Sequence, residues 1–143
     1  MLYYRQRSFI DLIWVTLLMI SFTLASCASI PIDMHKAARG YWETVPGKPP
    51  PDLPGRRVYA SVWYAIGIGK DNAASVEWYR GTGWCIQTNG QVVGNEIRLI
   101  VDDVATTFTI HDDTHATVTF RWGQTTYVKQ LKKTRDDPNV GCY

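Results

Sequence analysis

The stretch that decides the fold is IRLIVDDVATTFTIHDDTHATVTFRW, residues 97–122. Its apolar residues recur at nearly every second position, and Asp102-Asp103 and the polar segment 111–114 interrupt the pattern. A period of two places alternate side chains on the two faces of a β-strand, and aspartate favours turns because it bonds to nearby backbone. Consecutive strands with short connections pair antiparallel. The stretch therefore predicts three antiparallel strands that share one apolar face.

The same alternation extends outward from this stretch in both directions. It predicts further strands over residues 58–66, 74–79, 84–88 and 125–132. Asn89-Gly90 predicts a hairpin turn, because both residue types tolerate positive φ. Gly123-Gln124 predicts the turn into the final strand.

These segments amount to about six to seven strands, with no amphipathic helix of convincing length. A meander with one apolar face buries that face either by closing into a barrel or by folding over as a sandwich. We therefore predict an all-β domain over residues 56–143, a small antiparallel meander barrel with a sandwich as the alternative.

The N-terminus has the layout of a secretory signal. Arg5 and Arg7 precede an apolar run from Leu12 to Ala25, and a basic segment followed by an apolar one is typical of export signals. The run is about 14 residues long, whereas a helix that spans a bilayer needs roughly 20. A cleaved signal is therefore favoured over a permanent transmembrane helix.

The end of this run, Leu24-Ala25-Ser26-Cys27, resembles the lipobox of bacterial lipoproteins. The resemblance implies that residues 1–26 are removed as a signal peptide and that Cys27 carries diacylglycerol and an N-linked acyl chain such as palmitate. Two or more chains suffice for stable anchoring, at about 0.8 kcal/mol per buried methylene. The alternative is an ordinary signal peptide, cut after Ser26 or Ser29.

The residue after the lipidated cysteine helps to sort lipoproteins between membranes, and here it is Ala28 rather than an aspartate. The resemblance therefore implies the outer membrane of a Gram-negative cell envelope, with the domain in the periplasm. In a Gram-positive cell the same anchor would hold the protein on the plasma membrane.

Lipidation of Cys27 would leave Cys85 and Cys142 as an even pair in an oxidising compartment. We predict a disulfide bond between them, with a stabilisation of about 4 kcal/mol on the chain-entropy model.

Residues 27–55 are predicted to form the lipidated cysteine and a proline-rich tether. Pro49-Pro50-Pro51 favours an extended spacer. Tyr41-Trp42-Glu43 interrupts the tether with two large aromatic residues, which we expect to dock on the domain or to form its first short strand.

A Gly-x-Trp start, regular hairpins and a final strand ending in lysines resemble the lipocalin-like and lysozyme-inhibitor-like β-domains of other bacterial lipoproteins. The resemblance covers roughly residues 56–133 and rests on this arrangement.

Removal of Arg5, Arg7 and Asp11 with the signal leaves a nearly neutral chain. Near-neutrality argues against a nucleic-acid partner. A basic cluster remains near the C-terminus, at Lys129, Lys132, Lys133 and Arg135. We interpret these side chains as solvated lysines that protect an edge strand from aggregation; contact with acidic head groups or an acidic enzyme surface is the alternative.

Residues suited to catalysis or metal binding are sparse. His111 and His115, with Asp112 and Asp113 between them, could share a cation across a hairpin, but ordinary turn chemistry explains them equally well. The chain has no Gly-x-Ser-x-Gly nucleophile motif. We therefore predict no enzyme activity, no metal site and no cofactor beyond the covalent lipid.

The aromatic residues carry the remaining functional signal. The tryptophans at 42, 63, 78, 84 and 122 mostly suit a barrel core, whereas Trp63 and Tyr59 fall on the opposite face and are candidate binding residues. We predict a membrane-anchored envelope lipoprotein whose β-domain binds a small apolar ligand or an envelope protein. The alternatives are an inhibitor of a lysozyme-type enzyme, acting through acidic loops at Asp102-Asp103 and Asp112-Asp113, and a structural assembly factor of an envelope complex.

Overall fold

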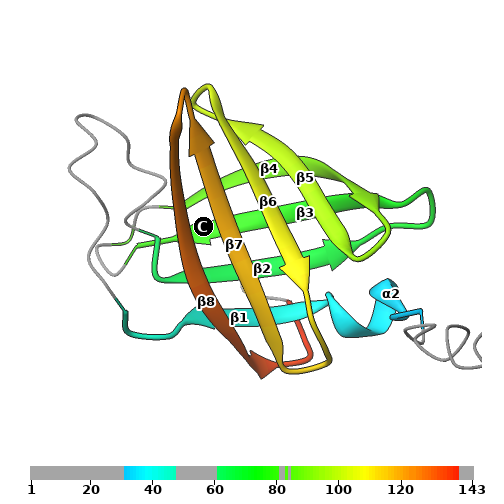
Figure 1. Ribbon diagram of the computed structural model, residues 1–143. Coiled ribbons are helices and arrows are strands. Elements are labelled where there is room, and N and C mark those ends of the chain that lie inside the picture. Colours follow the sequence, from blue (N-terminus) through cyan, green and yellow to red (C-terminus); the bar gives the residue numbers. More distant parts are fainter. Residues whose placement is uncertain (1–30, 48–60, 81–82, 84, 139–143) are drawn as a thin grey trace, which may run out of the picture. The chain divides into compact units, whose positions relative to one another are not determined.

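The computed structural model describes residues 31–47, 61–80, 83 and 85–138. Its elements, in chain order, are α2 (Met34–Ala37), β1 (Gly40–Thr44), β2 (Trp63–Ile68), β3 (Ala73–Tyr79), β4 (Cys85–Val93), β5 (Glu96–Val101), β6 (Val104–Ile110), β7 (His115–Trp122) and β8 (Thr125–Arg135). Each strand pairs antiparallel with the next, and β8 pairs with β1, so that the sheet closes into a barrel (Figure 1). The predicted all-β meander barrel is confirmed, with eight strands rather than six or seven, and the sandwich alternative is wrong.

The additional strand is β1, which lies inside the segment predicted as a tether. It pairs with β2 on one side and with β8 on the other, so the expectation that Tyr41-Trp42-Glu43 forms the first short strand is confirmed. The compact unit that contains the barrel begins at Ile32, ahead of the predicted boundary at residue 56. The remainder of the predicted tether, 48–55, lies outside the described residues.

Burial of Trp42 explains why this segment joins the barrel. Its side chain is fully buried, and its indole N–H donates a hydrogen bond to the Ala38 carbonyl oxygen at 2.9 Å. Ala38 directly follows α2, whose N-cap residue Asp33 accepts a hydrogen bond from the backbone N–H of His35. The aromatic residue therefore gains apolar contact and keeps its one donor satisfied.

Two of the predicted turns had different outcomes. Asp102 and Asp103 connect β5 to β6 with φ values of 49° and 62°, as a tight two-residue hairpin requires. The turn predicted at Asn89-Gly90 is wrong, because both residues lie within β4 and the chain reverses instead around Gly94. A Cβ atom at Gly90 would lie 3.0 Å from the Arg98 carbonyl oxygen, so this glycine allows β5 to approach closely.

Inward-facing side chains of the strands form the core, and aromatic rings fill its centre. The Tyr64, Trp78 and Phe108 rings pack edge to face with centroid separations of 5.2–5.6 Å. Trp42 and Trp78 are fully buried, as predicted for core tryptophans, whereas Trp122 is only partly buried. Trp84 lies outside the described residues.

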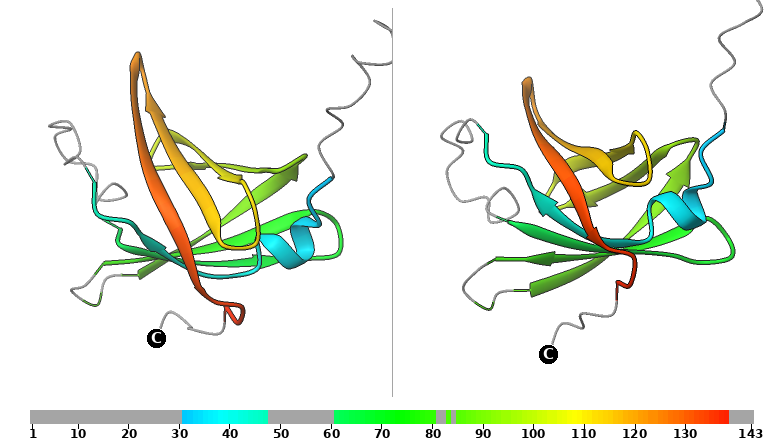
Figure 2. Two further views of the ribbon diagram at one scale, coloured as in Figure 1. Left: turned by 60° about the horizontal axis from the view of Figure 1, so that its bottom comes forward. Right: turned by 90° about the horizontal axis from the view of Figure 1, so that it is seen from below.

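The barrel has two different ends. Helix α2 and the connections after β2, β4 and β6 lie at one end, which we call the helix end. Strands β1, β3, β5 and β7 end at the other, which we call the opposite end. Figure 2 shows β7 and β8 rising together away from β1 to β3, with α2 at the helix end.

Candidate functional site

Strand β8 corrects our interpretation of the basic cluster near the C-terminus. The strand pairs with both β7 and β1, so it is not an edge strand and needs no protection by solvated lysines. Lys132 does face outward and is exposed, but Lys129 points into the barrel and is only 9% exposed. The cluster is therefore divided between the surface and the interior.

Lys129 lies beside a carbonyl group and two aromatic rings. Its Nζ donates a hydrogen bond to the Ser61 carbonyl oxygen at 2.9 Å and lies 5.7 Å from the centroid of Phe120 and 5.9 Å from that of Tyr127. These distances allow cation–π attraction. Burial lowers the pKa of the Lys129 ammonium to about 8, because desolvation disfavours the charged form.

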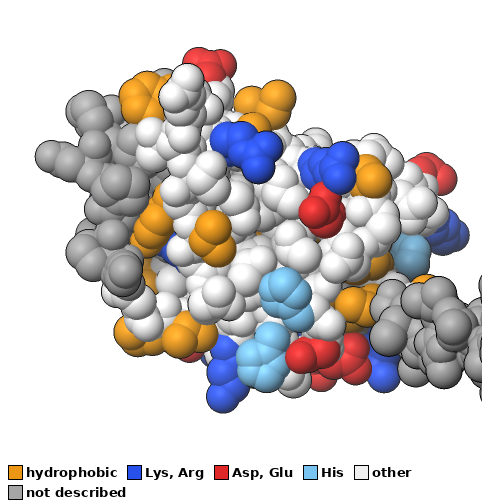
Figure 3. Space-filling view, in the orientation of Figure 1, with side chains coloured by type: hydrophobic (Ala, Val, Ile, Leu, Met, Phe, Trp, Pro, Cys, Tyr) orange, Lys and Arg blue, Asp and Glu red, His pale blue; other side chains and the backbone are white. Residues whose placement is uncertain are grey.

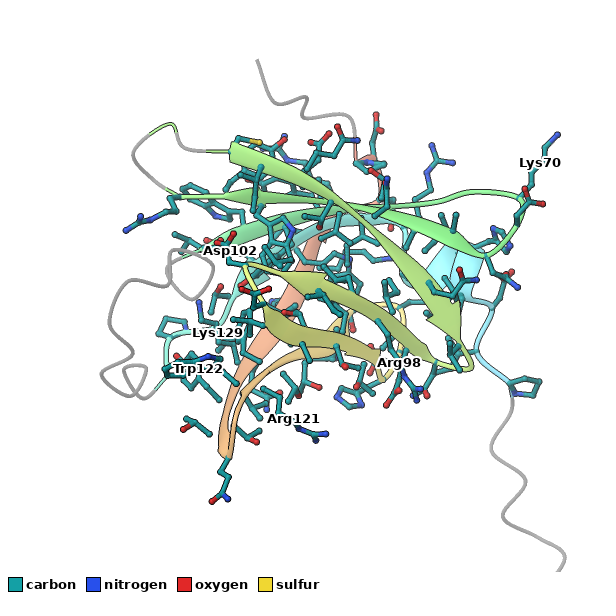
Figure 4. All side chains as sticks on the ribbon, turned by 90° about the horizontal axis from the view of Figure 1, so that it is seen from above. Lys70, Arg98, Asp102, Arg121, Trp122 and Lys129 are labelled. Atoms are coloured by element: carbon teal, nitrogen blue, oxygen red, sulfur yellow. The ribbon has the colours of Figure 1, made fainter. Side chains whose placement is uncertain are left out.

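The position of Lys129 follows from the unequal lengths of β1 and β8. The pairing of these strands reaches only from Arg135 to Leu131, and Lys129 lies beyond it, toward the opposite end. There the side chain reaches from β8 to Ser61, just before β2 begins. Figure 4 shows Lys129 and Trp122 on the side of the barrel that carries Asp102, whereas Lys70 lies on the other side.

Ser61 contributes a second polar group beside this ammonium. The residue is 1% exposed, and its hydroxyl Oγ is buried with no hydrogen-bond partner among the described residues. Buried hydroxyl groups are almost always hydrogen-bonded, and an unsatisfied one costs about 1–3 kcal/mol. The main chain of Ser61 thus binds Lys129 while its side chain keeps an unused donor and acceptor.

Aromatic side chains next to Lys129 are partly open to solvent. Trp122 and Tyr127 pack against the core but are only partly buried, whereas Phe120, deeper in the barrel, is 1% exposed. The Tyr127 and Phe120 rings are stacked, with centroids 6.1 Å apart. At the opposite end, the buried Lys129 thus lies among buried and partly exposed side chains, and we call the set the mouth cluster: Ser61, Phe120, Trp122, Tyr127 and Lys129.

Sequence reasoning named Lys129 only as a solvated lysine of the basic cluster, and it missed Ser61. Lys129 could have been found, because it alternates in phase with Tyr127 and Leu131 and so falls on the apolar face of its strand. Ser61 gave no such signal, since its burial depends on the approach of β8 across the barrel.

Of the predicted binding residues Trp63 and Tyr59, the structure describes only Trp63. This residue begins β2 and is partly buried, opposite Tyr79 of β3. It alternates with the buried Tyr64 and therefore lies on the outer face of the barrel. Tyr59 lies outside the described residues.

Asp112 and Asp113 lie in the connection between β6 and β7, at the helix end, so the structure does not bring them together with Trp63. Asp112 accepts hydrogen bonds from the Thr114 hydroxyl at 2.8 Å and the Thr114 backbone N–H at 2.7 Å, and a further one from the His115 N–H at 2.8 Å. These bonds, that of the Thr114 side chain above all, hold the pKa of the Asp112 carboxyl well below its usual range. Asp113 is exposed, 3.8 Å from the Lys36 ammonium.

His111, in this connection, and His115, at the start of β7, each have a local partner. His111 Nε2 lies 3.2 Å from the Thr117 hydroxyl, and His115 Nδ1 lies 3.1 Å from the Asp112 carboxylate. Figure 3 shows histidine and acidic side chains gathered over this connection. Among the residues that the structure describes, no group of three or more His, Cys, Asp or Glu side chains is arranged to hold a metal ion.

The cysteine predictions rest mainly on undescribed segments. The signal peptide 1–26, Cys27 and Cys142 all lie outside the described residues, and Cys85 is the first residue of β4. The lipid anchor and the Cys85–Cys142 disulfide remain predictions.

No known protein family matches the chain, and no curated protein is significantly similar to it. Within the described part of the chain, no helix has the length and apolar character needed to cross a membrane.

Proposed function

We propose that the protein is a lipid-anchored envelope protein whose barrel binds a small apolar ligand through the mouth cluster. The observation that carries this proposal is the partial exposure of Trp122 and Tyr127 around the interior Lys129. Ligand sites are typically apolar and aromatic concavities with a few well-placed polar groups, and the mouth cluster has this composition.

Binding of a neutral, apolar fluorescent probe tests the proposal. N-phenyl-1-naphthylamine is titrated into full-length protein that carries Cys27→Ser, so that no covalent acyl chain competes for the site. Trp122→Ala should weaken binding by about tenfold or more, in line with the loss of one large aromatic contact.

Trp63→Ala is the matched control, because Trp63 lies near the same end of the barrel but on its outer face. This variant should bind the probe as the parent does. Weaker binding in Trp63→Ala and unchanged binding in Trp122→Ala would place the site on the outer face, and absence of binding in the parent would refute the proposal.

The proposed anchor is the lipidated Cys27, which would hold the domain at the outer membrane with its barrel in the periplasm. The support is the lipobox Leu24-Ala25-Ser26-Cys27. Labelling of cells with a radioactive fatty acid should mark the parent protein and not the Cys27→Ser variant. Labelling that persists in the variant would contradict the anchor.

The proposed disulfide joins Cys85 to Cys142. Pro138 lines a surface depression with Ser75 and Asn89, which pair with each other on the outer face of β3 and β4. Cys85 lies on the same face, four residues before Asn89, which is about 13 Å along an extended strand. The chain from Pro138 to Cys142 is also four residues long and can span that distance when extended. Peptide mapping without reduction should find the two cysteines in one linked fragment; two alkylated free thiols would contradict the bond.

A further inference from the structure

We propose that a depression on the outer face of β5, β6 and β7 binds a saccharide of about two rings that carries one acidic group. The site lies outside the barrel and apart from the mouth cluster, so it goes beyond the proposed function and does not depend on it. It is carried by a guanidinium, a set of hydroxyl groups and a carboxylate that line the same depression.

The depression is built by the register of the three strands. Arg98, Thr107 and Thr119 are direct neighbours across β5, β6 and β7, so their side chains form one row on the same face of the sheet. They alternate with buried residues of these strands, and the row therefore lies on the outside of the barrel. Figure 4 shows Arg98 and Arg121 on the same side of these strands.

Two further rows extend the depression along the strands. Toward the helix end Glu96 pairs with Thr109, and toward the opposite end Ala105 pairs with Arg121. The residues of all three rows line one depression of about 480 Å³. Successive rows on one face are about 7 Å apart, so the three rows extend over about 14 Å. This length suits a ligand of two sugar rings better than a single small ion.

The two arginines of the depression differ in their partners. The Arg98 guanidinium donates to the Glu96 carboxylate through Nε at 2.8 Å and lies 2.6 Å from it through Nη2. Arg121 is exposed and takes part in none of the ion pairs between described residues. Arginine keeps its charge and presents a planar fork of donors that fits a carboxylate or a phosphate. Arg121 is therefore the group that would bind the acidic part of the ligand.

Threonine hydroxyl groups lie between Arg121 and Glu96. Thr107, Thr109 and Thr119 are partly buried, and their hydroxyls form no hydrogen bond with another described residue, whereas the Thr106 hydroxyl on the inner face donates to a backbone carbonyl oxygen. A hydroxyl both donates and accepts hydrogen bonds, and the threonine methyl groups add apolar contact. Such a lining matches a sugar ring, which has hydroxyls at its edge and C–H groups on its faces.

The order of these groups selects among ligand classes. A fatty acid or a simple anion would use Arg121 and leave the hydroxyls unpaired. A nucleic acid needs several cations for its phosphates, and here it would meet the Glu96 carboxylate. A sugar with one acidic group can place that group at Arg121 and donate a hydroxyl to Glu96, because a carboxylate that already binds an arginine still has lone pairs to accept with.

Three matched probes test the proposal: neutral cellobiose, cellobiouronate, in which a carboxylate replaces one hydroxymethyl group, and cellobiose 6′-phosphate. Each is titrated into full-length Cys27→Ser protein and followed by the NMR signals of the backbone amides. The acidic probes should bind at least about tenfold more tightly than cellobiose, as expected for one hydrogen bond between charged groups, and should shift the signals of Thr107, Thr119 and Arg121. The tighter of the two identifies the acidic group as a carboxylate or a phosphate.

Variants assign the roles, and their spectra show whether each remains folded. Arg121→Gln should remove the preference for the acidic probes and leave cellobiose binding unchanged, and Arg121→Lys should retain part of the preference. Thr119→Val should weaken all three probes severalfold, because it removes a hydroxyl with little change of shape. Lys132→Gln is the matched control, since Lys132 is an exposed cation of β8 that does not line the depression; it should bind all probes as the parent does.

The remaining outcomes would contradict the proposal. Equal binding of cellobiose and its acidic forms would overturn the acidic group. Binding of acetate or inorganic phosphate as tight as that of the acidic disaccharides would overturn the saccharide. Absence of binding by every probe, or an equal loss of binding in Lys132→Gln, would overturn the site. Trp122→Ala should leave saccharide binding unchanged, and a loss there would show that the site is not separate from the mouth cluster.

Discussion

The two ends of the barrel use the same residue type in opposite ways. Lys133 and Lys129 both point inward from β8, four residues apart. At the helix end, the Lys133 ammonium lies 5.2 Å from the Trp42 ring, donates to the Lys36 carbonyl oxygen at 3.3 Å and lies 3.6 Å from the Asp136 carboxylate. At the opposite end, Lys129 donates to Ser61, whose hydroxyl has no described partner.

Under the proposed function, this difference assigns stability to the helix end and ligand binding to the opposite end. At the helix end, the buried Met34, Ala37 and Ala38 cover the core. The Lys133 ammonium completes this cover. The opposite end keeps a desolvated cation next to partly exposed rings. Interior polar groups that cost folding free energy are frequent at functional sites.

The largest expected effect is at the helix end. Trp42→Ala should lower the free energy of unfolding by about 3–5 kcal/mol, because it opens a large cavity and removes the contacts that fasten α2 and β1. Urea denaturation followed by tryptophan fluorescence measures the change. Trp122→Ala, at the opposite end, should cost less than half as much; equal losses would show that both ends serve stability alike.

Lys129→Met should have the opposite sign and stabilise the protein by about 1–2 kcal/mol at pH 7, as seen when buried charges are replaced by apolar isosteres. The folded-state pKa of about 8 lies below the ordinary value of 10.5, so the unfolded chain binds the proton more tightly. The charge on Lys129 therefore lowers the free energy of unfolding by its full amount below about pH 8. This loss becomes smaller as the pH rises from about 8 toward 10.5.

Urea denaturation of Lys129→Met and the parent at pH 7 and pH 10 tests this pH dependence, and the stability difference should shrink at the higher pH. Tyr127 lies beside Lys129 and Tyr64 shares the Ser61 carbonyl oxygen with it, and burial raises the pKa of both hydroxyls above the usual 10.0. They therefore remain mostly neutral over this range. A Lys129→Met variant that is less stable than the parent at pH 7 would show that the lysine is structural, as Lys133 is.

Ser61→Ala should change stability by less than about 1 kcal/mol and in the stabilising direction, because it removes an unsatisfied hydroxyl and leaves the carbonyl bond to Lys129 in place. Thermal unfolding by circular dichroism is sufficient to measure this. A marked loss of stability would mean that the hydroxyl is already hydrogen-bonded in the ligand-free protein.

The smallest effect is expected for Asp112→Asn, in the exposed connection at the helix end. The hydrogen bonds to Asp112 lower its pKa, so they stabilise the loop above the ordinary carboxyl pKa of 3.8, and this contribution is lost as the pH falls toward the lower folded-state value. The variant should melt slightly below the parent at pH 7 and bind the fluorescent probe unchanged. Weaker probe binding would extend the site to the helix end.

Local patterning accounts for the part of the fold that could be predicted. The alternation of residues 97–122 placed β5, β6 and β7 correctly, and Asp102-Asp103 formed the expected turn. The turn predicted at Asn89-Gly90 is wrong because a glycine can allow two strands to approach closely as well as form a turn. The approach of β5 depends on residues outside this dipeptide, so the local pattern did not reveal it. Of the mouth cluster, the sequence singled out Trp122 as an aromatic residue and Lys129 as a solvated lysine, and it gave no sign of Ser61.

The sequence by itself determined the period of the strands, most of their turns and the candidate lipidation signal at Cys27, because each depends on neighbouring residues. Only the tertiary structure decided that β1 joins β8 and that Lys129 lies inside the barrel. Closure pairs residues 41–44 with 131–135, and burial of a side chain depends on what arrives from distant strands. The same lysine at an open sheet edge would be solvated, and it becomes a candidate ligand-binding group because the barrel closes around it.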